Sequence, residues 1–163
     1  MSFTADQVIA ELGLIPHPEG GAFRETYRAP ESVAGREDHC AATLIYFLLR
    51  VGQVSSWHRV LGADEHFLFH GGDPYRLIWI GGDGGLHDQP VGMAIDAGER
   101  PQRTVSAGCW QAAYVDAGGA HGWSLVACVV SPGFEFADFE MATDDEILAL
   151  YPDLDGPVRL PRL

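Results

Sequence analysis

The residues of this chain best suited to chemistry lie in two neighbouring segments, 54–60 and 65–70, that read as strands. Alternate side chains of a strand share a face, so Ser56 and His58 are predicted to point the same way. Glu65 begins the next strand, where it can lie beside them. An imidazole suits proton transfer near neutral pH, and a neighbouring carboxylate can fix its tautomer. His58 and Glu65 are therefore the candidate catalytic residues.

The same residues allow a different interpretation as metal ligands. Zinc, iron or manganese needs three or four convergent nitrogen and oxygen donors. His58, Glu65 and Gln111 supply three such donors, and Ser56 is a poor fourth. A divalent metal at this site therefore stays open beside the metal-free alternative.

A third interpretation is a small-molecule binder without catalysis. Ser56 and Gln111 would then bind polar groups of the ligand, and aromatic residues would supply apolar walls. The candidate walls are Tyr46, Trp57, Phe67, Phe69 and Trp110. His17 precedes Pro18 and is expected in a surface loop, away from this site.

The elements that must position these residues are short runs rich in β-branched and aromatic side chains, separated by Gly, Asp and Pro clusters. This pattern of short strands and turns predicts an all-β sandwich or barrel. The predicted strands are 22–28, 41–49, 54–60, 65–70, 75–80, 85–91, 103–105, 111–115 and 124–130.

Two capping-box patterns predict a short helix at each end of these strands. Thr4 to Gln7 precedes one apolar run, which Gly13 ends, and Thr143 to Glu146 precedes the other. The resulting organisation is one domain over residues 1–163, with a helical lead-in at about 4–13, a β-barrel at about 22–140 and a helix at about 144–150. The segment 41–49 is apolar on both faces, which indicates that both are covered and favours a homodimer.

Composition narrows the partners and the compartment. The chain has 163 residues, 47% of them hydrophobic, and 10 basic residues against 23 acidic ones give a net charge of −13. This charge disfavours nucleic acid and anionic membranes as partners. The three cysteines are widely spaced, which suggests neither a disulfide framework nor a zinc knuckle. With no basic leader and no apolar run long enough to span a bilayer, the expected location is the cytoplasm.

The spacing of the candidate site residues resembles the first motif of the cupin superfamily. That motif reads Gly, five residues, His-x-His, a short gap, Glu, six residues and Gly. Gly52, His58, Glu65 and Gly72 keep this spacing, whereas Val60 stands where the second histidine belongs. The second cupin motif, Pro-x-Gly-x-x-His, is similar to residues 106–111, with serine in place of the proline and glutamine in place of the histidine.

The chain looks most like a subfamily of small bacterial and fungal cupins without an assigned reaction. The resemblance rests on blocks between about residues 12 and 140: 17–21, 24–26, 56–72, 110–111 and 131–136. It implies a double-stranded β-helix, or jelly roll, related in shape to the RmlC-like sugar-nucleotide epimerases.

The sequence therefore predicts a cupin that binds a small polar metabolite, with a carbohydrate derivative as the first choice. Isomerase or epimerase chemistry with His58 as the base is the leading hypothesis. The alternatives are a metal-dependent cupin enzyme, such as a dioxygenase or an isomerase, and a non-catalytic binding protein.

Overall fold

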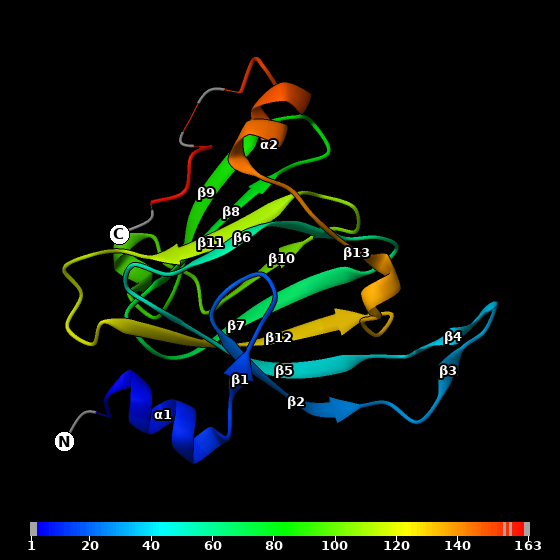
Figure 1. Ribbon diagram of the computed structural model, residues 1–163, viewed down its shortest axis with the longest axis horizontal. Coiled ribbons are helices and arrows are strands. Elements are labelled where there is room, and N and C mark those ends of the chain that lie inside the picture. The colour runs from blue at the N-terminus through cyan, green and yellow to red at the C-terminus, as the bar shows by residue number, and fades with distance from the viewer. Residues whose placement is uncertain (1–2, 155, 157, 162–163) are drawn as a thin grey trace.

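Two antiparallel β-sheets face each other in this computed structural model, which describes residues 3–154, 156 and 158–161 (Figure 1). The larger sheet has the order β1 (Ile15–Pro16), β2 (Ala22–Arg28), β5 (Thr43–Arg50), β12 (Trp123–Ser131), β7 (Asp64–Gly72) and β10 (Gln102–Val105). The smaller has the order β13 (Phe139–Met141), β6 (Val54–Val60), β11 (Gln111–Val115), β8 (Tyr75–Ile80) and β9 (Leu86–Val91). Strands far apart in sequence, such as β12 and β5, thus pair in the antiparallel pattern of a jelly roll, as the sequence predicted.

The strands expected from the sequence are all present, and 22–28, 54–60, 75–80 and 111–115 keep their bounds. Four further short strands were not predicted: β1, β13 and the hairpin of β3 (Ser32–Val33) and β4 (Arg36–Cys40), which projects from the sandwich (Figure 1). Their two to five residues are too short, and in β4 too charged, for an alternating apolar pattern to develop.

The two predicted helices are α1 (Ala5–Leu12) and α2 (Asp144–Leu150), and both carry complete capping boxes. At the first, the Thr4 hydroxyl accepts from the Gln7 N–H at 3.3 Å, and the Gln7 side chain accepts from the Thr4 N–H at 2.9 Å. Gly13 ends α1 in the left-handed conformation, at φ 62°. Two single turns of 3₁₀ helix, η1 (Ile95–Ala97) and η2 (Phe136–Asp138), lie in the connections.

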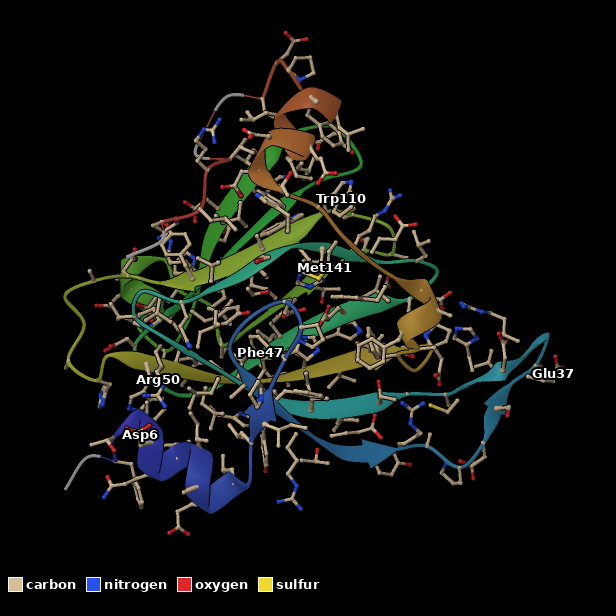
Figure 2. The ribbon with its side chains drawn as sticks, viewed as in Figure 1. Asp6, Glu37, Phe47, Arg50, Trp110 and Met141 are labelled. Carbon is tan, nitrogen blue, oxygen red and sulfur yellow. The ribbon has the colours of Figure 1, made fainter. Side chains whose placement is uncertain are left out.

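The apolar side chains form three layers. The central layer fills the space between the sheets and includes Phe47, which Figure 2 labels, with Leu49, Phe67, Tyr75 and Leu77. α2 and the segment at Val158 to Leu160 cover the outer face of the smaller sheet, where the Trp57 indole donates to the Val158 carbonyl at 3.0 Å. None of the helices in the described residues is long and apolar enough to cross a membrane.

α1 covers part of the outer face of the larger sheet. Val8 and Leu14 pack there against Leu48 and Trp123, and an ion pair joins Asp6 to Arg50 at 2.5 Å. Figure 2 shows Asp6 and Arg50 lying side by side at this contact. Both faces of β5 are therefore covered, as its apolar pattern predicted, but over Leu48 the cover is α1 of the same chain.

Candidate functional site

A β-bulge in β6 decides which serine faces the interior. His58 pairs with Gln111 and Ser55 with Ala113, so the pairing register between β6 and β11 shifts by one residue. The shift reverses the alternation, because side chains of a strand change face at every residue. Ser55, only 1% exposed, points inward in place of Ser56. The prediction that the Ser56 side chain lies beside His58 was therefore wrong.

Ser56 contributes its backbone. Its carbonyl lies 2.8 Å from Nδ1 of His58, and its N–H donates to the Glu19 carbonyl at 2.8 Å. Since a carbonyl only accepts, His58 carries its proton on Nδ1 and presents the lone pair of Nε2 to the interior. This tautomer is the one that a base acting through Nε2 requires.

The loop of residues 17–21 brings two further chemical groups to His58. It connects β1 to β2, rises from β1 in Figure 1, and contacts β6 through the Glu19 carbonyl. Gly20 permits this close approach, because a Cβ there would lie 2.1 Å from the Val54 carbonyl oxygen, and its φ is 113°. The paired glycines thus seat His17 and Glu19 against the bulge of β6.

Glu19 lies between the two histidines. Its Oε2 is 3.4 Å from Nε2 of His58 and 3.5 Å from Nδ1 of His17, and its Oε1 accepts from the Ser55 hydroxyl at 2.9 Å. The side chain of His17 is 6% exposed and packs edge-on against Phe23, with ring centroids 4.5 Å apart. The expectation that His17 lies in a surface loop, away from the site, was therefore wrong.

Glu65 and Gln111 form a second polar pair next to His58. The Gln111 amide Nε2 donates to Oε2 of Glu65 at 2.5 Å and lies 3.2 Å from Nε2 of His58. Gln111 is 1% exposed and lies behind the residues that line the cavity. The structure thus places His58, Glu65 and Gln111 together, with the Gln111 amide in contact with the other two side chains.

These groups form the floor of a cavity of about 90 Å³. That volume is well below the roughly 300–1,000 Å³ of pockets that hold drug-sized ligands, so the cavity suits a small ligand or the reacting end of a larger one. The aromatic walls are Phe23, Phe47, Phe134, Phe136 and Phe139, and Phe136 is 59% exposed at the mouth.

The predicted walls Tyr46, Phe67 and Trp110 do not line this cavity. Tyr46 points to the outer face of β5, where its ring meets His70. Phe67 stacks on Tyr75 deeper in the central layer. Trp110 lies on the outer side of the smaller sheet under the Arg59 guanidinium, well separated from Phe47 in Figure 2.

Burial favours the neutral forms of the ionisable side chains at the cavity floor. It raises the pKa of Glu19 to about 8, against which the Ser55 hydrogen bond acts, and it also raises the pKa of Glu65. Burial lowers the pKa of His17 to about 4, helped by the neighbouring His58, and lowers the pKa of His58 as well. Near neutral pH the imidazoles are therefore neutral and the Glu19 carboxyl largely keeps its proton.

The donor set does not fit a transition-metal site. Val60 lines the cavity with an apolar side chain where the cupin pattern has a second histidine. Gln111 turns its NH₂ group, which cannot ligate a metal, toward both His58 and Glu65. Among the described residues, no three His, Cys, Asp or Glu side chains are grouped so that they could hold a metal ion.

Comparisons with known proteins agree with this fold. The model of the family described as Cupin superfamily (DUF985) matches residues 6–142. The uncharacterized protein YML079W of Saccharomyces cerevisiae is 31% identical, over 96% of this chain and 83% of its own.

Solved structures of other proteins are similar to this chain in fold, and two of them are also similar in sequence. A hypothetical protein from Leishmania major superposes with a TM-score of 0.86 at 37% identity, over 92% of this chain and 93% of that one. Protein SO0799 from Shewanella oneidensis gives 0.83 at 40% identity, over 92% and 91% of the two chains. Oxalate decarboxylase from Bacillus subtilis, at 14% identity and a TM-score of 0.56 over 84% of this chain and 34% of its own, shares the fold alone. Fold, motif spacing and sequence similarity together show that the chain belongs to the cupin superfamily, in the family designated Cupin_5.

Proposed function

We propose that this cupin binds a small polar metabolite in the cavity and moves a proton on it, as an isomerase or an epimerase does. The observation that carries the proposal is the pairing of His58 with Glu19. His58 offers an unprotonated Nε2, and Glu19, 3.4 Å away, holds a proton near neutral pH. A base and an acid whose pKa values are shifted in opposite directions are the equipment of proton-transfer enzymes.

The roles follow from the geometry. His58 removes a proton from a carbon next to a carbonyl group through Nε2, because its Nδ1 is held by the Ser56 carbonyl. The substrate carbon then approaches Nε2 beside the Gln111 amide, which lies 3.2 Å from that nitrogen. Glu19 donates its proton to the carbonyl oxygen as negative charge develops there, and the Ser55 hydroxyl supports the carboxylate that remains. His58 then returns its proton to the former carbonyl carbon while Glu19 recovers a proton from the neighbouring hydroxyl, which gives the isomer. If the enediol turns over in the cavity first, the proton returns to the other face of the original carbon and gives the epimer.

The polar floor and the apolar walls together favour a compact ligand with hydroxyl and carbonyl groups. Glu19, His58 and Glu65 serve such groups as hydrogen-bond donors or acceptors, and the phenylalanines contact its carbon skeleton. A carbohydrate derivative meets this description.

The test is hydrogen exchange. The protein is incubated in deuterated water with a panel of hydroxy ketones, hydroxy aldehydes and sugars, and NMR follows deuterium entering next to the carbonyl group. We expect at least one compound to exchange and His58→Ala to slow this by about 100-fold or more, in the range of general base catalysis. His70→Ala is the matched control, since His70 lies on the outer side of β7 against Tyr46.

The outcomes separate the alternatives. Exchange at an unchanged rate in His58→Ala would remove His58 as the base. Binding of a panel member without any exchange would support the non-catalytic binding protein instead.

We further propose that the protein works in the cytoplasm as a homodimer. The free thiols of Cys40, Cys109 and Cys128 suit a reducing compartment. Leu68 and Val129 are half-buried side chains beside a shallow groove at the β7 and β10 side of the larger sheet, beyond the residues that contact α1, and a second copy would cover them. Sedimentation equilibrium tests the homodimer, because a monomer at all accessible concentrations would contradict it.

A further inference from the structure

The charges around the mouth of the cavity are unbalanced. Among the described lining residues Arg28 is the one cationic side chain, and it lies between the carboxylates of Glu25 and Glu135. Two carboxylates against one guanidinium leave one negative charge at the entrance.

Arg28 has no donor left for a ligand. Its Nε and one terminal nitrogen donate to Glu25 at 3.1 Å and 2.9 Å, that terminal nitrogen also donates to the Phe134 carbonyl at 3.2 Å, and the other donates to Glu135 at 2.5 Å. The last nitrogen also faces the sulfur of Cys40 at 3.9 Å. An anionic ligand would thus meet a fully engaged guanidinium and two repelling carboxylates.

The floor offers an anion no compensation. His17 and His58 are buried, and the cavity-lining residues of the loop 17–21, β6 and β7 include Glu19 and Glu65, whereas none of the described lining residues from these three elements is a lysine or an arginine. An anion moved into this space would lose its hydration without gaining an opposite charge.

A cation finds the opposite conditions. The wall contains five phenylalanine rings, whose π-faces carry the negative potential that attracts ammonium groups, and Phe136 stands exposed beside the acidic entrance. The net charge of −13 on the whole chain adds a long-range attraction for positive ligands.

We infer that the ligand of this cavity is a small protonated amine that also carries hydroxyl or carbonyl groups, such as an amino alcohol or an amino sugar. The acidic entrance and the phenylalanine walls bind the ammonium group, and the floor binds the oxygen functions. This inference rests on the proposed function, since both place the ligand in the same cavity.

The test uses three compounds of one size and different charge: ethanolamine, ethylene glycol and glycolate. Each is titrated into the intact protein while NMR follows the labelled imidazole of His58, and the Phe136 ring reports on the entrance. We expect ethanolamine to bind at least tenfold more tightly than ethylene glycol, and glycolate not to bind.

A double variant then tests the origin of the preference. Glu25→Gln together with Glu135→Gln removes both carboxylates and leaves the charge of Arg28 uncompensated, so we expect ethanolamine to lose about tenfold in affinity and glycolate to gain binding. Glu140→Gln is the matched control, because Glu140 pairs with Arg59 and does not line the cavity. Both exchanged side chains are about 40% exposed, so the double variant should keep its fold, which thermal melting verifies.

Equal or tighter binding of ethylene glycol or glycolate to the unaltered protein would overturn the inference and leave the proposed function standing, since the cavity would still bind a polar ligand. Unchanged selectivity in a folded double variant would overturn the role of the entrance carboxylates. No response of His58 to any compound would overturn the inference, and deuterium exchange on the carbonyl panel would then decide separately on the proposed function.

Discussion

The two ends of the sandwich interior are built from the same strands but do different work. On β7 the inward side chain at one end is Glu65, which lines the cavity, and the next inward one is Phe67, which belongs to the solid core. On β12 Val126 belongs to the core alone, whereas Cys128 belongs to the core and also borders the cavity. A shift of two residues along a strand thus leads from the core to the edge of the cavity.

The two ends differ because segments outside the central strands contribute side chains to one end only. The closed end is filled by large side chains of the strands themselves, such as Tyr75 and Leu77, which are each 1% exposed. At the open end, the loop 17–21 adds His17 and Glu19, and the segment of η2 and β13 adds aromatic walls. In this jelly roll the cavity therefore lies at the end of the interior where connecting segments, and not only the strands, supply the inward side chains.

Truncating one aromatic residue at each end tests whether the two ends of the interior are packed differently. Phe67→Ala at the closed end should lower the free energy of unfolding by about 3–5 kcal/mol, because it leaves a cavity in a packed core. Phe136→Ala at the mouth should change it by less than about 0.5 kcal/mol, since that ring is 59% exposed. Urea unfolding measures both, and similar losses would show that the cavity end is packed like the core.

A second prediction concerns the loop 17–21 at the open end. Gly20→Ala should cost about 2–4 kcal/mol, because its Cβ would meet the Val54 carbonyl at 2.1 Å in a left-handed backbone conformation. Gly35→Ala is the matched control: it also has a positive φ of 81°, but nothing lies within 4 Å of its Cβ, so only about 1–2 kcal/mol of backbone strain is expected. Equal melting temperatures of the two variants would contradict the close approach of the loop.

The open end should also make stability depend on pH. Native Glu19 has a pKa of about 8, above that of the unfolded chain, so the native state binds more protons and stability falls as pH rises toward 8. The lowered pKa values of His17 and His58 act in the opposite sense, but only below the ordinary histidine value near 6.5.

Between about pH 6.5 and pH 8 the loss should therefore reach about 2 kcal/mol, with Glu65 contributing in the same direction. Glu19→Gln should flatten this slope. Melting temperatures across the range measure it, and a slope that persists in the variant would assign the effect to other groups.

The smallest expected effect is that of removing metal. With Val60 and the NH₂ group of Gln111 in place of imidazoles, chelation should leave the melting temperature unchanged within about 1 °C. Val60→His combined with Gln111→His restores the missing donors, and zinc should then stabilise the variant by mass action. Near-stoichiometric metal in untagged protein, measured by elemental mass spectrometry, would contradict this interpretation of the donor set.

Sequence patterns predicted the fold well because alternation and capping are local properties. The strand that carries His58 and the capping box at Thr143 need only neighbours in the chain to be recognised. The pairing of His58 with Glu65 and Gln111 was predicted because the spacing of a known family motif carries long-range information.

The rest of the site depends on contacts that no local pattern specifies. Ser56 was assigned inward by strict alternation, and a bulge in the pairing with β11 reversed it. Tyr46 and Trp110 were chosen for their type, whereas the face of each strand assigned the walls to Phe23 and Phe47 instead. A signal for Glu19 did exist: the glycine pair that follows it indicates a backbone packed too closely for side chains.

His17 and Glu19 share one short loop, so two of the ionisable groups at the cavity are separate from the strands of the scaffold. The strands supply His58 and Glu65, while residues 17–21 supply the second imidazole and the second carboxyl, held by the glycine pair against β6. Replacing those five residues changes the acid–base equipment without altering a single core side chain of the central layer. Exchange of this loop would therefore change the ionisable groups of the cavity, and a replacement would have to keep Gly20 and Gly21, which fit against the Val54 and Leu48 backbone.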